Sequence, residues 1–379
     1  MDLHWLRDVA QTEGPFASVY LDSSHNTEDA PKRIELRWRA LRAALAEQGA
    51  DLETLAAIDD AIGVAAAAVD HPPGQVGQLL VAAHGSVVLN EFLPVPPDQE
   101  RARWSPAPDL LPALTHMPEQ LTTVVAVVDA TGADVYAGQH AEHLDTARYP
   151  MHKVRGGGWS HRKMQHRVEE NERASASETA RAIEDIVAAN GADLLVLAGE
   201  TQSRSRVRRA LRKRAQGIAE EVEAGGRAPG SDGAELDREV ARLVDARVSA
   251  IRRAEAERYA EIAGRGDGSS VDGVAPVTEA LRAAQVEALY LDAEQAPTEP
   301  LWIGPQAGQV ATEPEQLAGL GVRPAGPVDP VDALLRAAAG TGASFHPVGG
   351  GRTGLVGRTL TDGVGAILRS GPPGGQPST

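Results

Sequence analysis

The order of apolar and polar positions predicts a mixed α/β unit over the first 118 residues. Short β-branched and apolar runs predict strands, and apolar positions recurring every three or four residues predict helices. The predicted elements are a strand at Phe16–Asp22, helices at Arg33–Gln48 and Leu52–Val69, and a strand pair at Val76–Ala83 and Val87–Phe92 joined at His84–Ser86. Six prolines fall within Pro94–Pro112, so we expect a loop or linker without regular structure there.

A second unit begins near Thr122 with a pattern typical of a β-hairpin. The apolar run Thr122–Asp129 meets a turn at Ala130–Gly132 and continues into Ala133–Gly138. Downstream, Asn190-Gly191 is a helix-stop signal. The remaining predictions are an irregular stretch at Tyr149–Trp159, a long polar helix at Ser160–Asn190, a strand at Asp193–Ala198, an arginine-rich helix from Ser203, a break at Gly225–Gly233 and an amphipathic helix at Glu235–Ala263.

The segment Gly264–Ser270, rich in glycine, serine and aspartate, predicts a second boundary, and a compact α/β unit follows it. Its predicted elements are helices at Val277–Gln285 and Pro330–Ala339 and strands at Ala288–Asp292, Ala343–Val348 and Val364–Arg369. We therefore predict a mixed α/β (α+β) protein with domains at 1–118, 119–264 and 265–370, and a disordered tail at 371–379.

Composition narrows the chemistry that these domains can carry. Hydrophobic residues make up 42% of the chain and aromatic residues only 3%, so the cores must be built from Ala, Val and Leu. The absence of cysteine excludes disulfides, zinc-thiolate sites and cysteine nucleophiles. The sequence shows no signal-peptide pattern and no apolar run of about 18 residues, so we expect a cytoplasmic protein without membrane contact.

Positive charge is segregated in a chain whose formal net charge is −16. The segment 151–167 (MHKVRGGGWSHRKMQHR) contains five Lys and Arg and no acid. Three consecutive glycines let the backbone enter cramped space, the cations can neutralise phosphates, and Trp159 offers a face for stacking on a nucleobase. The alternative is a surface loop whose charges are merely solvated. A phosphate-binding P-loop is excluded, because the Gly-Lys-Ser/Thr ending is missing.

A second cluster places seven cations and no acid within residues 204–214. A helix so charged repels itself unless phosphates or carboxylates lie nearby. RNA contact is one interpretation; internal pairing with Glu220, Glu221 and Glu223 is the other. From the two clusters we predict the RNA-binding residues Lys153, Arg155, Gly156, Gly157, Gly158, Trp159, His161, Arg162, Lys163, Arg167, Arg204, Arg206, Arg208, Arg209 and Arg212.

Catalytic and metal-binding patterns are missing from the sequence. His161 and His166 are five residues apart, which is not the spacing of a helical metal pair, and no Gly-x-Ser-x-Gly elbow occurs. Solvated helix faces explain the carboxylate pairs of Glu235–Ala263. We therefore expect no catalytic residue, metal or cofactor. The segment Gly357–Arg369 is by itself compatible with an edge hairpin of the last domain.

In order and spacing, four segments resemble the archaeal and eukaryotic class I release factor and Pelota superfamily. They are VVAVVDATGADVYAG (124–138), RGGGWSHRKMQHR (155–167), LLVLAG (194–199) and DGVGAILR (362–369). More narrowly, the chain resembles the bacterial branch of the ribosome hibernation factor Balon and its mycobacterial relatives. The resemblance extends from about residue 122 to 370, and residues 1–118 show no trace of the family's codon-reading motif.

This resemblance implies a tRNA-shaped, three-domain protein in the ribosomal A site. Its third domain would be of the L7Ae/L30e type and face a translational GTPase, which is elongation factor Tu in bacteria. Release factors place Gln after Gly-Gly to position the hydrolytic water, but Trp159 follows Gly157-Gly158 here and has no amide carbonyl.

The resemblance therefore predicts a monomeric hibernation or stress factor that binds the 70S ribosome, including its rRNA, and blocks the A site without hydrolysis. The alternatives are a peptidyl-tRNA-hydrolysing release or rescue factor and a Pelota-like ribosome-splitting factor.

Overall fold

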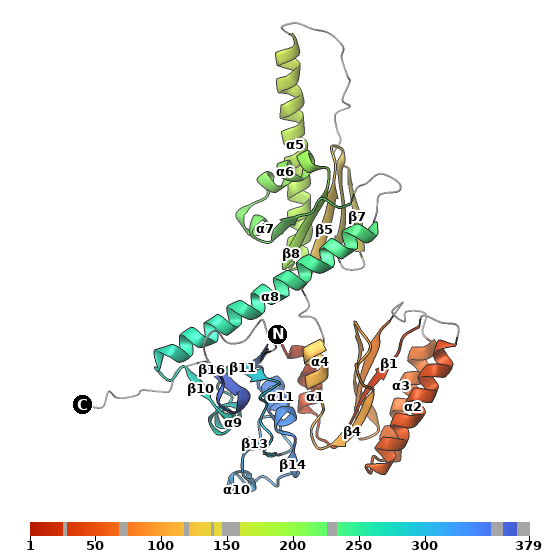
Figure 1. The fold of residues 1–379 in the computed structure, drawn as a ribbon, viewed down its shortest axis with the longest axis vertical. Helices are drawn as coiled ribbons and strands as arrows, with labels where there is room; N and C mark the ends of the chain where they lie inside the picture. The colour runs from red at the N-terminus through yellow and green to blue at the C-terminus, as the bar shows by residue number, and fades with distance from the viewer. Residues whose placement is uncertain are drawn as a thin grey trace, which may run out of the picture. The chain divides into compact units, whose positions relative to one another are not determined.

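The computed structural model describes residues 1–25, 29–67, 75–116, 121–137, 140–145, 160–225, 233–349 and 359–369 (Figure 1). The chain divides into two compact units. We call Met1–Pro118 with Ile251–Thr379 the end unit, and Glu119–Ala250 the middle unit. Both combine helices with sheets, which confirms the predicted mixed α/β class. The predicted tail and the irregular stretch 149–159 lie outside the described residues.

The first sheet of the end unit has the strand order β3-β2-β1-β4, and all its neighbours are antiparallel. Side chains alternate across it: Ala17 and Val19 pack against the helices, whereas Phe16 and Tyr20 join the core on the opposite face. The elements are β1 (Phe16–Asp22), β2 (Gly77–Ala83), β3 (Ser86–Leu93), β4 (Arg101–Ser105), α2 (Ala30–Glu47) and α3 (Leu52–Ala67). The predicted strands and helices of this region are confirmed within about three residues.

The prediction that Pro94–Pro112 lacks regular structure is wrong. Strand β4 lies within it and pairs with β1, and helix α4 (Leu111–His116) begins at its end. The prolines flank β4 rather than interrupt it, so its backbone N–H groups remain available for pairing. The Gln48 side-chain amide covers the outer edge of β4 by donating to the Ala102 carbonyl (3.1 Å) and accepting from the Trp104 N–H (2.8 Å).

The second sheet of the end unit has the order β10-β16-β11-β15, in which only β11 and β15 are parallel. Its elements are β10 (Ser270–Asp272), β11 (Val286–Asp292), β15 (Ser344–Val348), β16 (Val364–Leu368), α9 (Val274–Arg282) and α11 (Pro330–Thr341), preceded at β16 by a 3-10 turn η2 (Thr361–Gly363). The elements predicted for this region are confirmed. A small sheet, β13-β12-β14, was not predicted; it comprises β12 (Leu301–Ile303), β13 (Val310–Ala311) and β14 (Pro327–Val328), with α10 (Pro314–Ala318) beside it.

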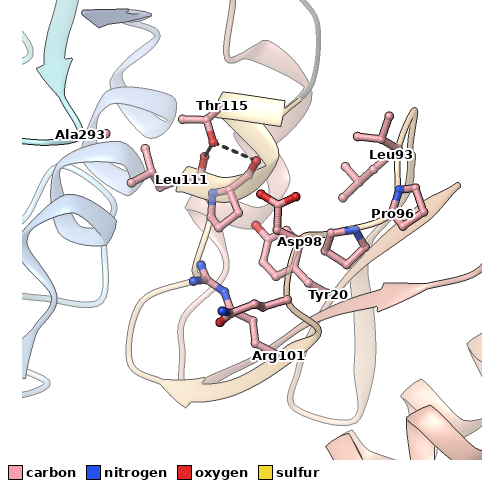
Figure 2. Close-up of a pocket in the computed structure, with 12 residues that line it drawn as sticks. Tyr20, Leu93, Pro96, Asp98, Arg101, Leu111, Thr115 and Ala293 are labelled. Carbon is pink, nitrogen blue, oxygen red and sulfur yellow. Dashed lines mark hydrogen bonds between the residues drawn. The ribbon is translucent and has the colours of Figure 1, made fainter. Parts of the chain in front are cut away.

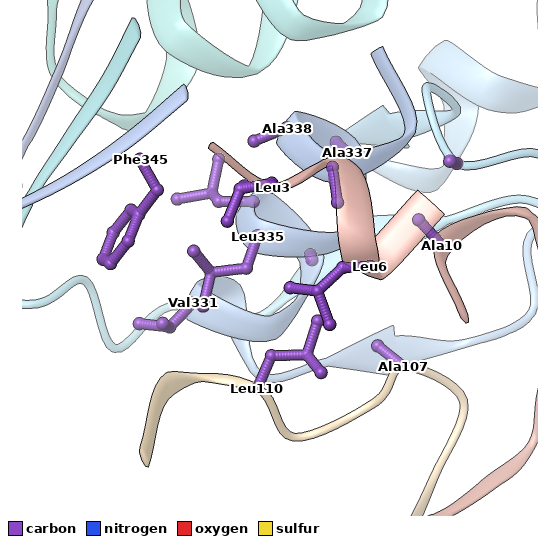
Figure 3. Close-up of a cluster of buried hydrophobic side chains, with 14 of the residues drawn as sticks. Leu3, Leu6, Ala10, Ala107, Leu110, Val331, Leu335, Ala337, Ala338 and Phe345 are labelled. Carbon is purple, nitrogen blue, oxygen red and sulfur yellow. The ribbon is translucent and has the colours of Figure 1, made fainter. Parts of the chain in front are cut away.

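Residues from both ends of the chain bury one continuous core in the end unit. Leu3 and Leu6, from the first turn η1 (His4–Leu6) and the residue before it, pack with Leu335 of α11 and with Phe345 of β15 (Figure 3). The next helix, α1 (Arg7–Gln11), adds Ala10 to this core. The first sheet contributes Phe16 and Tyr20 from β1 to the same cluster, so the two sheets share their apolar interior.

The middle unit contains a five-stranded sheet with the order β7-β6-β5-β8-β9. Its strands are β5 (Thr123–Val128), β6 (Gly132–Ala137), β7 (His140–Asp145), β8 (Leu194–Gly199) and β9 (Ala219–Glu221). The predicted β5–β6 hairpin is confirmed, and its turn is held by the Asp129 carboxylate, which accepts from the N–H groups of Thr131 and Gly132 at 2.7 and 3.0 Å. Strands β5 and β8 pair in parallel in the centre of the sheet.

Helices cover both faces of this sheet (Figure 1). Ile183 and Val187 of α5 (Ser160–Ala189) and Val207 of α6 (Thr201–Ala210) pack on one face, together with Ala215 of α7 (Lys213–Gly217). On the other face, α8 (Gly233–Arg265) contributes Leu236 and further apolar side chains. Helix α8 contributes residues to both units, because the division between them falls at Ile251.

Candidate functional site

The first predicted RNA-binding cluster falls at the start of α5. Lys153, Arg155, Gly156, Gly157, Gly158 and Trp159 lie outside the described residues. His161, Arg162, Lys163 and Arg167 belong to the first turns of the helix. No acidic residue occupies the first turn of α5, so the positive end of the helix dipole is not neutralised locally.

Helix α5 is much longer than the strands it packs on. Its 30 residues span about 45 Å at about 1.5 Å per residue, whereas the six residues of β5 span about 20 Å. The helix residues that join the core lie in its second half. The N-terminal half therefore extends beyond the sheet and carries the cationic segment with it (Figure 1).

The second cluster is divided between α6 and α7 rather than lying on one helix. The chain bends at Leu211–Arg212, where both residues have extended backbone conformations. Leu211 and Ala215 point into the core and are 3% and 5% exposed. The cationic residues on either side of these two apolar anchors consequently reach different environments.

Arg204 belongs to the interior of the middle unit. It is 4% exposed, and its guanidinium donates to the carbonyls of Gly199 (3.0 Å) and Val222. The Glu221 carboxylate lies 3.6 Å from Arg204 Nε. Internal pairing, which the sequence left open for this cluster, therefore occurs at Arg204, and this side chain has no surface to offer an RNA.

Two neighbouring arginines are partly engaged. Arg208 Nη1 lies 3.5 Å from the same Glu221 carboxylate, although its side chain is 40% exposed. Arg206 has a long contact of 3.5 Å with the Gln202 amide oxygen. The Glu221 carboxylate of β9 thus neutralises part of the cluster, on the side that carries Arg204 and Arg208.

Beyond Arg208 the cations are exposed. Arg212 is 81% exposed, and its Nε lies 3.5 Å from Glu184, which is largely buried. Arg209, Lys213 and Arg214 are exposed and have no acidic partner among the described residues. The outer part of the second cluster is therefore a cationic surface formed by the end of α6 and the start of α7.

Negative charge is concentrated in the other unit. The middle unit contains 19 Lys and Arg against 21 Asp and Glu, whereas the end unit contains 18 against 32. Nearly all of the net charge of −16 therefore belongs to the end unit. The acidic character of the whole chain does not oppose phosphate binding by the middle unit.

Comparison with known proteins places the middle unit in a family. Residues 122–265 match the family described as "Bacterial archaeo-eukaryotic release factor family 2". The Mycobacterium tuberculosis protein named "Uncharacterized protein Rv2629" is 33% identical over 371 residues and covers 96% of both chains. "Uncharacterized protein MT2704", from a second strain, matches to the same extent. The chain belongs to the bacterial archaeo-eukaryotic release factors.

Several solved structures of archaeal proteins are similar to this chain. Pelota in the "Model of ribosome-bound archaeal Pelota and ABCE1" is 13% identical, with 97% of this chain and 94% of that chain covered and a TM-score of 0.42. Archaeoglobus fulgidus Pelota is 15% identical, with 97% and 91% covered and a TM-score of 0.38. The archaeal termination factor aRF1 is 13% identical, with 96% of both chains covered and a TM-score of 0.24.

Among the described residues of this protein, the end unit contains a pocket of about 430 Å³ (Figure 2). The Thr115, Tyr20 and Arg101 side chains that line it are bonded within the protein. The Thr115 hydroxyl donates to the Leu111 carbonyl (3.0 Å), and the Tyr20 hydroxyl donates to that of Asp109 (2.8 Å). Arg101 forms an ion pair with Asp109 at 2.5 Å, and burial raises the pKa of that carboxyl. These contacts support the fold and form no nucleophile–base pair among the lining residues.

Within the described ranges, no group of three or more His, Asp or Glu is arranged to hold a metal ion. No helix in the described part of the chain combines the length and the apolarity that crossing a bilayer requires. The candidate functional site comprises the exposed cations at the end of α6 and the start of α7, together with the cationic residues at the start of α5.

Sequence reasoning missed two features of this site. It did not identify Glu184 as a partner of Arg212, because the two are 28 residues apart and meet only where α5 packs against α6, just before the bend. It counted Lys213 and Arg214 in the cluster but did not list them as RNA-binding residues, although they are among its exposed members.

Proposed function

We propose that this protein binds the 70S ribosome as a tRNA mimic in the A site and blocks translation there without hydrolysing peptidyl-tRNA. Membership in the release factor family makes it a translation-related, ribosome-interacting factor. The observation that carries the more specific proposal is the segregation of exposed cations in the middle unit of an acidic chain.

Two regions supply the affinity for rRNA in this proposal. The first is the cationic segment around the start of α5, which includes the glycine loop before it. The second is the outer surface of α6 and α7. Each cation that neutralises a phosphate releases counterions, so binding should weaken steeply with salt. The protein would act in the cytoplasm as a monomer, with elongation factor Tu as its delivery partner.

The absence of hydrolysis rests on the residue after the second glycine of the loop. Trp159 stands where release factors carry the glutamine that positions water. Its indole N–H can donate one hydrogen bond but has no carbonyl to accept one from a water molecule. The loop can then occupy the peptidyl transferase centre as a stacking and phosphate-binding element.

Co-sedimentation with vacant 70S ribosomes tests the binding. We expect the full chain to pellet with ribosomes at low salt and to be released as salt rises. Replacing Arg162, Lys163 and Arg167 by alanine should weaken this binding at least tenfold, because three phosphate contacts would be lost. The matched control is Arg238→Ala with Arg242→Ala, which removes exposed cations of α8 in the same unit. Equal binding by both variants would contradict the proposal.

Release of labelled peptide from ribosomes carrying peptidyl-tRNA tests the lack of hydrolysis. We expect no release above background and competition with aminoacyl-tRNA for the A site. Sustained release would instead identify a rescue or release factor. A shift of 70S particles to subunits in a sucrose gradient would identify a splitting factor. Repeating the binding with and without elongation factor Tu and GTP tests the delivery partner.

A further inference from the structure

The cations at the bend between α6 and α7 face solvent because the apolar residues of the bend are buried in the core of the middle unit. We define the elbow as Arg209–Arg214. Within it Leu211 is 3% exposed and packs with the core, as does Ala215 directly after it. The side chains of Arg209, Lys213 and Arg214 are therefore directed away from the core, and all three are exposed.

We infer that the elbow is a phosphate-backbone contact for ribosomal RNA that does not read base sequence. This inference rests on the proposed ribosome binding, but it assigns the contact to Arg209, Arg212, Lys213 and Arg214. It excludes Arg204, whose guanidinium is buried against main-chain carbonyls. Arg204 is a positioning residue that fixes α6 to the ends of β8 and β9.

Arg212 remains able to bind a phosphate despite its contact with Glu184. The Glu184 carboxylate accepts from the Arg212 backbone N–H, which holds it in place whatever the side chain does. The Arg212 side chain approaches this carboxylate through its Nε, at 3.5 Å, and is 81% exposed. A guanidinium has five N–H donors, so four remain for solvent or phosphate oxygens.

The elbow lacks aromatic rings and a free side-chain amide, two of the groups with which proteins read bases. Residues 200–225 contain no Phe, Trp or Tyr, so no aromatic ring offers a stacking face there. The neighbouring amide is also engaged, because Gln216 Nε2 donates to the Arg208 carbonyl at 3.0 Å. The exposed cations of the elbow are suited to contacts with phosphates, which position a nucleic acid and carry no sequence information.

An RNA is favoured over an acidic protein by the distribution of charge around the elbow. Residues 201–219 contain seven Lys and Arg and no acid, so no like-charged side chain of that segment would repel a phosphate backbone. The nearest carboxylate, Glu184, is itself largely buried. The chemistry required is a dense row of negative charge, which a phosphodiester backbone supplies at every nucleotide.

The test is the salt dependence of 70S binding by the full chain with Arg209, Lys213 and Arg214 all replaced by alanine. The slope of log K against log salt should fall in magnitude by about 2–3, since each lost phosphate contact removes about 0.7–0.9. Single variants Lys213→Ala and Arg214→Ala should each lower it by about one. The α8 variant Arg238→Ala with Arg242→Ala should leave the slope unchanged.

Three further measurements separate the possible failures. If the unmodified chain does not bind ribosomes, the proposed function fails; if it binds and the triple variant keeps the full slope, only the elbow assignment fails.

The triple variant should bind short RNA duplexes more weakly than the unmodified chain, and by the same factor for duplexes of different sequence. Competition by polyglutamate as effective as RNA of equal charge would overturn the inference in favour of an acidic protein. Arg204→Lys should lower the Tm while leaving the slope intact.

Discussion

At the scale of single residues, the burial of His346 links stability to pH. Its ring stacks on that of Tyr290 at 5.1 Å, and its Nε2 lies 3.0 Å from Ser344 Oγ and 3.9 Å from Glu255. Burial, with contributions from the positive charges of the N-terminal ammonium and then Arg258, lowers the pKa of His346 to about 3. The folded protein therefore keeps this imidazole neutral at pH values where the unfolded chain protonates it.

We predict that stability falls as the pH drops from about 6.5 towards 5. In this range the unfolded state binds a proton that the folded state does not, so lowering the pH favours unfolding. The loss at pH 5 should be roughly 2 kcal/mol, because each unit below the unfolded pKa contributes about 1.4 kcal/mol. Urea unfolding of wild type and His346→Gln at several pH values measures it. The variant should show a flatter pH dependence over this window, and identical curves would exclude His346 as the cause.

At the scale of elements, Gly199 controls how closely β8 approaches β5. Its φ is +97°, and a Cβ built there would lie 2.2 Å from the Val128 carbonyl oxygen. We predict that Gly199→Ala destabilises the protein by about 3 kcal/mol, since it combines backbone strain with a clash against main chain that cannot move freely.

Gly191 provides the matched control for this substitution. It follows α5 with a φ of +61°, but no atom lies within 4 Å of the position its Cβ would take. Gly191→Ala should therefore cost only about 1 kcal/mol, the backbone contribution alone. Thermal unfolding of both variants compares the two effects, and similar losses would show that the contact with Val128 relaxes.

Local signals identified most elements, whereas long-range pairing decided the rest. The β5–β6 hairpin and the end of α5 carry turn and stop residues in the sequence itself, and both were predicted. Strand β4 was missed because it forms by pairing with β1, which lies some 80 residues earlier in the chain, and because the prolines around it indicate a loop. Strands β12–β14 have only two or three residues each, too few to show an alternating pattern.

The same limit applies to the candidate site. Arg204 and Arg209 belong to one run of arginines that looks uniform in the sequence. Their difference arises from tertiary packing, which brings the carbonyls of Gly199 and Val222 to Arg204 and leaves Arg209 in solvent. Charge density in the sequence therefore predicted that a cationic surface exists, but not which side chains form it.

At the scale of the whole molecule, the shared core makes the two ends of the chain depend on each other within the end unit. Leu335 of α11 is fully buried in the cluster that also contains Leu3, Phe16 and Tyr20. Arg336, the next residue, is 1% exposed, and its guanidinium donates to the carbonyls of Pro305 (2.6 Å) and Thr12 (3.5 Å). Apolar and polar contacts thus both join the beginning of the chain to α11.

We predict that Leu335→Ala loosens β1 as well as the sheet that α11 covers. Removing this side chain should cost about 2–5 kcal/mol, the range for a large-to-small change in a well-packed core. Because β1 faces the same cluster, its amide protons should lose protection in hydrogen exchange together with those of β11. Ile58→Ala is the control, because Ile58 of α3 belongs to the separate cluster on the opposite face of the first sheet, where α3 contacts β2, β3 and α2. If Leu335→Ala lowered protection in β11 while β1 kept its own, the two ends would be separately stable, and the continuous core would be a contact between independent domains.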